Sequence, residues 1–425
     1  MDAGTARLLL DEGLDLLAEL PPYEEKDALA LGTRLRGQGH DPALVAAVLT
    51  QARLRARARG KFGDDAARML FTADGLEQAT RREVAGRHAE RFARAGVTRV
   101  HDLGCGLGAD AIAFARHGIE VHAVDADEAT ALLAAHNLAV CTTGEGNERG
   151  REEAGLCSHD SPAVTHRTAE DAVAHVETTD GVWFDPARRT PGRTDARGRT
   201  RRTFRLEDLT PSWDLVVATA DRAPATAAKL SPGFPHPAIP AGTEAEWVST
   251  AGDLVECAVW WGPLVGTAGR TATMLRPAAD LVGVTEADAV GAPPPGLIGP
   301  TPGGLVYEPD LAVLQAGLVG ALARAVDGSE LAPGVGYVAA ERVTDVEFAR
   351  RHRVVEVLPA QVKAVKAWAR REGVTGLTLK RRGGPIDPDD FRRRLGLGTK
   401  GGDQATLLLT TGPEGPLALV LDRDD

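Results

Sequence analysis

Two acidic residues and a group of alternating glycines give the strongest chemical signal in the sequence. Asp102 closes a short apolar run and Asp125 closes the next one, and the glycines between them are Gly104, Gly106 and Gly108. Glycine lets a strand turn sharply into a helix, and it lets backbone N–H groups approach a ligand that a Cβ atom would hold away. A carboxylate at the end of the second strand is the usual partner of ribose hydroxyls. The pattern therefore predicts a site for a nucleotide-shaped cofactor.

The acid that precedes the glycines discriminates between two cofactors. Gly104, Gly106 and Ala109 also satisfy the G-x-G-x-x-G/A fingerprint of dinucleotide-binding proteins. Asp102 would face a pyrophosphate with like charge, whereas it can attract the ammonium group of a methionine moiety, directly or through water. The segment thus resembles motif I of class I S-adenosylmethionine (SAM)-dependent methyltransferases, and this resemblance implies SAM as the cofactor. The structural alternative is a glycine-rich turn that binds nothing.

A second motif, Phe-Asp-Pro-Ala-Arg-Arg at residues 184–189, follows a strand predicted at 182–184. It resembles the Asn/Asp/Ser-Pro-Pro-aromatic motif of methyltransferases that act on exocyclic base nitrogens. Asp185 and Pro186 match, which implies a side-chain oxygen and a backbone carbonyl that accept the hydrogens of the nucleophile. Ala187 and Arg188 replace the second proline and the aromatic ring, although a guanidinium can also stack on a base or bind phosphate. This departure leaves exocyclic-amine chemistry open.

Two further cofactor contacts are implied by resemblance alone. Residues 71–85 resemble the segment that precedes motif I in trimethylguanosine-synthase-like RNA methyltransferases, where the position of Thr80 approaches the cofactor. Asp171 follows the predicted third strand, at the position where class I methyltransferases commonly hydrogen-bond the adenine amino group. The alternative for Asp171 is an acid that complements the positive N-terminal end of a helix.

Charge is distributed very unevenly along the chain. The net charge is −11, yet residues 188–205 contain eight arginines and one aspartate, and residues 361–400 contain eleven basic and four acidic residues. Local potential, rather than net charge, decides where a polyanion binds. We expect these basic segments to bind substrate phosphates, although an arginine run is also typical of a solvated loop or helix face. The candidates are Arg188, Arg189, Arg193, Lys380, Arg381 and Arg382.

Composition excludes several classes of protein. The four cysteines form no Cys-x-x-Cys pair, so we expect free thiols and no metal site. The sequence has no apolar run of the roughly 18 residues that a transmembrane helix needs, and its first residues lack the pattern of a signal peptide. We therefore expect a soluble, cytoplasmic protein with no membrane partner.

The pattern of elements predicts four regions. Residues 1–96 contain helical segments, one of them opening at Asp41-Pro42 and the last at Thr80, where Glu83 completes a capping box. Residues 97–280 alternate strand and helix, which is typical of a parallel sheet covered on both faces. Strand-like runs from 227 to 275 are expected to complete this sheet with antiparallel members. A Pro/Gly-rich linker and a helix at 310–326 fill residues 281–345. The region 346–425 predicts two helices on a small sheet that ends in a hairpin at 405–421.

The combination of these features resembles bacterial class I methyltransferases that end in a THUMP-like domain, over residues 60–425. The implied fold is α/β: a Rossmann-like SAM-methyltransferase sheet, preceded by a helical region and followed by a ferredoxin/THUMP-like α+β domain. THUMP domains are associated with RNA, so the resemblance implies a structured RNA substrate, such as rRNA or tRNA. The alternatives are a SAM- or RNA-binding protein without transferase activity, and a methyltransferase of another substrate. An NAD-dependent dehydrogenase is disfavoured by Asp102.

Overall fold

The computed structural model describes residues 1–142, 163–188, 205–276, 281–383, 386–397 and 404–422. The chain divides into two compact units. The first unit comprises Met1–Leu230 and Val259–Gly266, and the second comprises Ser231–Ala258 and Thr267–Asp425. In the part of the chain that is described, no helix is both long and apolar enough to cross a membrane.

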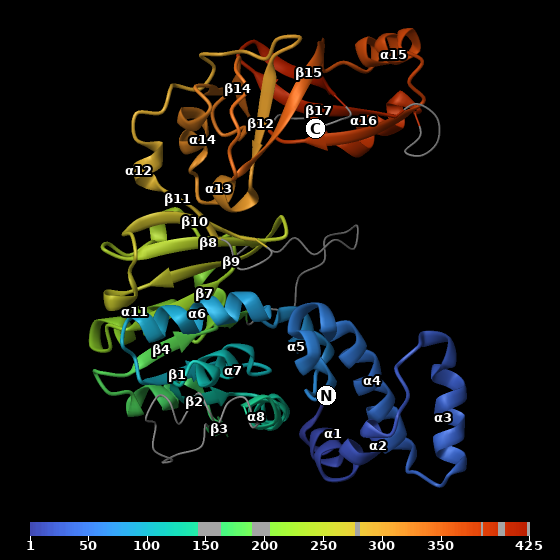
Figure 1. Ribbon diagram of the computed structural model, residues 1–425, viewed down its shortest axis with the longest axis vertical. Coiled ribbons are helices and arrows are strands. Elements are labelled where there is room, and N and C mark those ends of the chain that lie inside the picture. Colours follow the sequence, from blue (N-terminus) through green and yellow to red (C-terminus); the bar gives the residue numbers. More distant parts are fainter. Residues whose placement is uncertain (143–162, 189–204, 277–280, 384–385, 398–403, 423–425) are drawn as a thin grey trace. The chain divides into compact units, whose positions relative to one another are not determined.

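The first unit begins with a layer of helices (Figure 1). Helix α4 begins as predicted, because the Asp41 carboxylate accepts hydrogen bonds from the N–H groups of Ala43 and Leu44 and Pro42 occupies the first turn. Its inner face buries Leu44, Val48 and Phe62. The helices of this layer are α1 (Ala3–Leu8), α2 (Leu14–Ala18), α3 (Ala28–Gly37), α4 (Pro42–Phe62) and α5 (Ala73–Gln78).

A parallel sheet forms the rest of the first unit. Its strands are ordered β7-β4-β1-β2-β3, and each neighbouring pair runs parallel. The strands are β1 (Arg99–Leu103), β2 (Glu120–Asp125), β3 (Ala163–His166), β4 (Gly181–Phe184) and β7 (Thr226–Leu230). The connecting helices are α6 (Arg82–Arg94), α7 (Ala109–Arg116), α8 (Glu128–Thr142), α10 (Ala169–Ala172) and α11 (Trp213–Arg222). The predicted alternation of strand and helix is confirmed.

The start of α6 differs from the prediction. The helix begins at Arg82, Arg81 precedes it without a side-chain cap, and the Thr80 hydroxyl donates instead to Asp110 over 2.7 Å. A hydrogen bond to a buried carboxylate is about twice as strong as a neutral one, so it outweighs the capping bond. The predicted Thr80–Glu83 capping box is therefore wrong.

The second unit begins with strands β8 (Glu244–Thr250), β10 (Gly269–Leu275) and β11 (Leu281–Thr285), while β9 (Asp253–Trp260) is divided between the units. Ala251 and Gly252 join β8 to β9 with φ values of 51° and 83°, as a two-residue hairpin turn requires. Strand β10 pairs antiparallel with β11 but parallel with β8. The expectation of antiparallel members is thus confirmed only in part.

A seven-stranded sheet, ordered β13-β14-β12-β15-β18-β17-β16, forms the rest of the second unit. The hairpin predicted at 405–421 is present as β17 and β18, whereas the helix predicted at 310–326 is two helices separated at Gly317, whose φ is +70°. The strands are β12 (Leu305–Pro309), β13 (Ser329–Glu330), β14 (Val338–Ala340), β15 (Ala349–Pro359), β16 (Gly376–Arg381), β17 (Gln404–Gly412) and β18 (Gly415–Leu421). The helices are α12 (Glu286–Ala289), α13 (Leu311–Gln315), α14 (Val319–Ala325), α15 (Val362–Arg371) and α16 (Pro388–Leu395).

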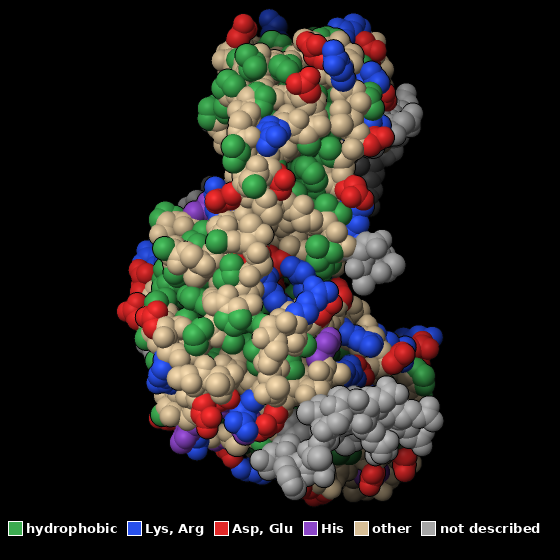
Figure 2. All heavy atoms as spheres, turned by 60° about the vertical axis from the view of Figure 1, so that its left-hand side comes forward, with side chains coloured by type: hydrophobic (Ala, Val, Ile, Leu, Met, Phe, Trp, Pro, Cys, Tyr) green, Lys and Arg blue, Asp and Glu red, His purple; other side chains and the backbone are tan. Residues whose placement is uncertain are grey.

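The α+β arrangement predicted for the C-terminal part rests on a core of its own. Val365 and Trp368 of α15 and Phe391 of α16 are buried together with Leu377 and Leu407 of the sheet. On the face shown in Figure 2, acidic and basic side chains are interspersed among apolar ones. The excess of acidic residues therefore does not form a uniform patch on that face.

Candidate functional site

The carboxyl ends of four parallel strands in the first unit carry the charged side chains of the candidate site. Asp102 lies near the end of β1 and Asp125 ends β2. Asp185 follows β4 directly, and Lys229 lies near the end of β7. Because parallel strands end at the same edge of a sheet, the fold brings these residues together where open α/β sheets bind ligands.

The glycine turn between β1 and α7 has the geometry that its sequence predicts. Gly104 has a φ of +97°, and a Cβ atom there would lie 2.9 Å from the carbonyl oxygen of Asp185. Gly106, with a φ of +54°, faces open space. Gly108 precedes α7 in the left-handed conformation, with a φ of +84°. These positions require glycine, and the turn lies directly beside the Asp185 backbone.

Asp102 is a buried carboxylate without a partner. Its residue is 1% exposed, and neither of its carboxylate oxygens has a hydrogen-bond partner among the described residues. Burial, together with the negative charges of Asp110 and Asp185, raises the pKa of Asp102 well above its usual value. Among the described residues, no cation forms an ion pair with this carboxylate. A cationic ligand could supply the missing counter-charge.

A chain of polar contacts runs beside Asp102. The Lys229 ammonium donates to Asp185 Oδ2 over 2.5 Å and to the Thr80 hydroxyl over 3.0 Å. Thr80 in turn donates to Asp110, and His88 Nδ1 lies 2.7 Å from the other oxygen of Asp110. Burial alone would raise the pKa of Asp110, but the hydrogen bond and charge of His88 and the charge of Lys229 outweigh it, and the pKa falls below its ordinary value.

Sequence reasoning missed three members of this network: Lys229, Asp110 and His88. One signal was available for Lys229, since it is the only charged residue in Ala225–Leu230, whose other residues are small or apolar. A lysine in a buried strand needs a nearby acid. Asp110 carried a weaker signal, because an acid in the first turn of α7 could equally have been a solvated charge that complements the helix dipole.

The segment before α6 lies against the glycine turn. A Cβ atom on Gly75 would lie 3.0 Å from Leu107, inside the turn. The Asn137 side chain donates to the carbonyl oxygens of Leu70 and Leu107, over 2.9 and 3.0 Å, and so ties the two segments together. Thr80, at the end of this segment, is buried and contacts Asp110 and Lys229. The residues that resemble an RNA-methyltransferase lead-in therefore adjoin the predicted cofactor site.

The two remaining acids predicted to bind the cofactor lie in different surroundings. Asp125 accepts hydrogen bonds from the N–H groups of Gly106, over 3.0 Å, and Asp127, over 2.9 Å. Burial raises its pKa. Asp171 is exposed in the first turn of α10, where its carboxylate accepts from the Thr168 hydroxyl over 2.8 Å. Its contact with adenine stays a prediction.

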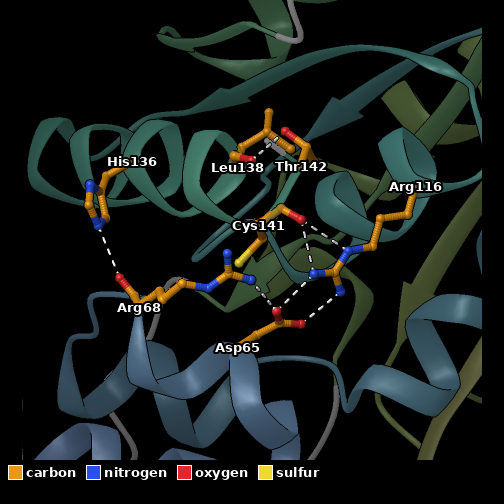
Figure 3. A network of polar contacts seen from close by, with 7 residues as sticks. All are labelled: Asp65, Arg68, Arg116, His136, Leu138, Cys141 and Thr142. Carbon is orange, nitrogen blue, oxygen red and sulfur yellow. Dashed lines mark hydrogen bonds and ion pairs between the residues drawn. The ribbon is translucent and has the colours of Figure 1, made fainter. Parts of the chain in front are cut away.

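An ion-pair network holds the C-terminal end of α7, the end opposite to the glycine turn (Figure 3). Arg116, at the end of α7, donates to both oxygens of Asp65 over 2.7 and 2.8 Å, and also to the carbonyl oxygen of Cys141 in α8. Arg68 donates to the same Asp65 carboxylate. The hydrogen bond from Arg116 is the main cause that lowers the pKa of Asp65. The network fixes the helix whose N-terminus follows the glycine turn.

The predicted phosphate-binding residues fall into two groups. Arg188 lies in the short strand β5 (Ala187–Arg188), which pairs with β6 (Leu209–Thr210), whereas Arg189 and Arg193 lie outside the described residues. In the second unit, Glu308 forms ion pairs with Lys380, 2.7 Å from Nζ to Oε2, and with Arg382, 3.5 Å from Nη2 to Oε1. Arg381 is exposed. Lys380 and Arg382 also line a cavity of about 360 Å³. Glu308 thus offsets part of their charge.

Among the described residues, no group of three or more His, Cys, Asp or Glu side chains could hold a metal ion. Cys105, Cys141 and Cys257 are buried free thiols. Burial raises the pKa of Cys141 to about 11, which favours the protonated, less nucleophilic thiol at neutral pH.

Comparison with known proteins agrees with this architecture. A family model described as THUMP domain-like matches residues 349–423, and a model described as a domain of unknown function (DUF8688) matches residues 3–58. No curated protein matches the chain. The crystal structure of a protein from Porphyromonas gingivalis W83, described as a candidate methyltransferase, is similar with a TM-score of 0.65 and 21% sequence identity, over 94% of this chain and 99% of that chain.

Two other solved structures match less closely. A SAM-dependent methyltransferase from Agrobacterium tumefaciens has a TM-score of 0.27 and 16% identity, over 51% of this chain and 63% of that chain. Magnesium protoporphyrin IX methyltransferase from Synechocystis PCC 6803, with bound SAM, has a TM-score of 0.27 and 12% identity, over 57% and 100%. Similarity this low establishes nothing about the fold. The fold shared with the Porphyromonas protein and the THUMP-like match confirm the predicted fold class.

Proposed function

We propose that this protein is a SAM-dependent methyltransferase that acts on structured RNA in the cytoplasm. The observation that carries the proposal is Asp102: a buried carboxylate without a partner, located beside a turn of three glycines at the carboxyl end of β1. A cationic ligand with a nucleoside body matches both features. The shared fold with the Porphyromonas protein and the THUMP-like match support the same class.

The residues at this edge of the sheet fit the parts of SAM. Asp102 would attract its ammonium group, the N–H groups of the glycine turn would approach it closely, and Asp125 would accept from the ribose hydroxyls. Asp171 would accept from the adenine amino group, and Thr80 would lie next to the cofactor. When bound, SAM supplies a methyl group that its positive sulfur makes electrophilic. The protein mainly has to hold the nucleophile in line with that methyl group.

Asp185 and Pro186 would position the nucleophile. The Lys229 ammonium lies 2.5 Å from Asp185 Oδ2 and pairs with this carboxylate, which would accept a hydrogen of the nucleophile. The carbonyl oxygen of Pro186 would accept a second hydrogen. Arg188, Arg189 and Arg193 would bind phosphates near the acceptor, and Lys380, Arg381 and Arg382 would bind phosphates on the second unit.

A protein that binds SAM or RNA without transferring the methyl group is the second candidate. It is favoured by Ala187 and Arg188, which stand where base-modifying methyltransferases have a proline and an aromatic residue. A substrate other than nucleic acid also remains compatible with the fold, since fold alone does not determine the substrate.

Calorimetric titration with SAM and with NAD tests the cofactor. We expect heat of binding for SAM only, with a large loss of affinity for Asp125→Ala. Absence of SAM binding, or undiminished binding by Asp125→Ala, would overturn the assignment.

The RNA substrate needs a separate experiment. Mass spectrometry of nucleosides from rRNA and tRNA, in cells with and without the gene, should show the loss of one methylated nucleoside. Restoring the wild-type gene should return it, and an Asp185→Asn gene should not. Unchanged RNA with altered methylation of protein or small molecules would contradict the RNA part of the proposal and leave the SAM part standing.

A further inference from the structure

The segment from the end of α3 through α4 carries a concentration of positive charge that the proposed function does not use. Residues 34–61 contain seven basic residues and one acidic residue, in a chain whose net charge is −11. The basic residues are Arg34, Arg36, Arg53, Arg55, Arg57, Arg59 and Lys61. A positive segment in an acidic chain indicates a polyanionic partner.

Two of these arginines form a row on the exposed face of α4. Arg53 and Arg57 are one helical turn apart, and both are exposed. Residues four apart lie on the same face, with Cβ atoms about 5–6 Å from one another. The opposite face buries Leu44, Leu54 and Phe62. Packing therefore fixes the helix so that this arginine row, Arg53 and Arg57, points into solvent.

The arginine row is not neutralised by neighbouring acids. Within the described residues, neither Arg53 nor Arg57 forms an ion pair, whereas exposed arginines elsewhere do. Arg94 pairs with Glu90, and Arg371 pairs with Glu356 and Glu372. The positive charge of the arginine row is thus available to a partner.

The arginine row leads toward the candidate active site. Lys61, one turn beyond Arg57, donates to the carbonyl oxygens of Leu76, Glu77 and Ala79. The next residue is Thr80, which accepts a hydrogen bond from Lys229. Burial, followed by the positive charges of Arg81 and Lys229, lowers the pKa of Lys61. Basic side chains therefore follow one another from the exposed face of α4 to the edge of the sheet, where Lys229 pairs with Asp185.

We infer that the arginine row of α4 binds the phosphate backbone of the RNA substrate and guides it to the site at Asp185. This inference rests on the proposed RNA substrate and adds the surface that holds it. Guanidinium groups bind phosphate oxygens through paired hydrogen bonds, and two of them one turn apart can bind neighbouring phosphates. The helical region, which matches a domain of unknown function, thereby acquires a role in substrate binding.

Fluorescence anisotropy with a labelled RNA hairpin, measured over a range of salt concentrations, tests the inference. The variant Arg53→Gln/Arg57→Gln removes two positive charges at exposed positions. The control Arg7→Gln/Arg94→Gln removes the same charge from exposed arginines that are paired with acids, Arg7 with Glu128 and Arg94 with Glu90. Thermal unfolding and SAM titration of each variant serve to show that the fold and the cofactor site are unchanged.

We expect the negative slope of log K against log salt to become shallower by about 1.4–1.8 in the test variant, since each phosphate contact contributes about 0.7–0.9 to its magnitude. We also expect at least a tenfold loss of affinity at low salt, and wild-type values for the control. Equal slopes for test variant and wild type would overturn the inference, as would a wild-type protein that fails to bind the hairpin. In either case, the calorimetric titration with SAM tests the proposed enzyme class independently of the arginine row. Preferential binding of an acidic protein by the arginine row would likewise contradict the inference.

Discussion

Lys229 and Asp185 form an ion pair that joins the carboxyl ends of β7 and β4, with 2.5 Å between Nζ and Oδ2. Their side chains are 14% and 34% exposed. The same ammonium group contacts Thr80, so one cation links the predicted catalytic acid to the segment that precedes α6. We therefore predict that Lys229 is a positioning residue, which would act on the nucleophile through Asp185.

Lys229→Met should destabilise the protein and impair methyl transfer more than SAM binding. Removal of the ammonium deprives the half-buried Asp185 carboxylate of this ion pair, at a cost of about 1–3 kcal/mol in unfolding free energy. Denaturant unfolding of Lys229→Met, Asp185→Asn and the double variant forms a thermodynamic cycle. We expect a coupling energy of about 1–3 kcal/mol, and purely additive effects would contradict the ion pair. Lys229→Arg, which keeps the charge, should recover part of the kcat.

Asp102→Asn should affect stability and cofactor binding in opposite directions. The change removes a buried charge without a partner, so the ligand-free protein should be at least as stable as wild type in urea. SAM affinity should fall tenfold or more, about 1.4 kcal/mol, because the ammonium group loses its counter-charge. Asp221→Asn, on the exposed surface of α11, is the matched control. Wild-type affinity in Asp102→Asn would show that this carboxylate does not face the ligand.

The same side chain predicts an unusual dependence on pH. Because the folded state raises the pKa of Asp102, stability of the ligand-free protein should decrease as pH rises from the ordinary aspartate value, about 3.9, through the raised one. SAM affinity should increase over the same interval, since only the ionised carboxylate attracts a cation. Calorimetry at several pH values should show this increase in the wild-type protein. In Asp102→Asn it should be absent, and an identical increase there would assign the effect to another group.

Glu308 should make the second unit sensitive to acid. Burial would raise the pKa of Glu308, but hydrogen bonds from His352 and Lys380 and the charges of Lys380 and Arg382 lower it far below its usual value. Its stabilisation is therefore complete above the unfolded-state value, about 4.3, and is lost as pH falls through the depressed folded-state value. Glu308→Gln should lose about 2 kcal/mol near neutral pH and show a weaker acid dependence in urea unfolding. Glu341→Gln, an exposed acid, should behave like wild type.

Local patterns in the sequence predicted most of the first unit. The Asp41-Pro42 start of α4, the glycine turn and the order of strands and helices each depend on residues close together in the chain. The capping box at Thr80 failed because the competing partner, Asp110, is thirty residues away in sequence. The tertiary fold determines which partner a hydroxyl group binds, and short-range sequence patterns carry no information about that fold.

The chemistry of the site was only partly visible in the sequence. Asp102, Asp125 and Asp185 stand at strand ends within recognisable motifs, so their types and spacing indicated a role. Lys229 and His88 lie in segments that read as an ordinary strand and an ordinary helix. Their function depends on the neighbours that the parallel sheet brings to them. The basic residues of the C-terminal domain illustrate the same limit, since Glu308 binds Lys380 and Arg382 from a distant strand.

The hydrogen bonds between Asp125 and the N–H groups of Gly106 and Asp127 have a kinetic consequence. They fix the glycine turn in the ligand-free protein, so we expect that ligand binding does not have to order this loop and loses little conformational entropy there. Association of SAM should then follow a single exponential whose rate rises linearly with ligand concentration, without the plateau that a preceding rearrangement imposes. The acid at the end of β2 would then affect the speed of SAM binding as well as its strength.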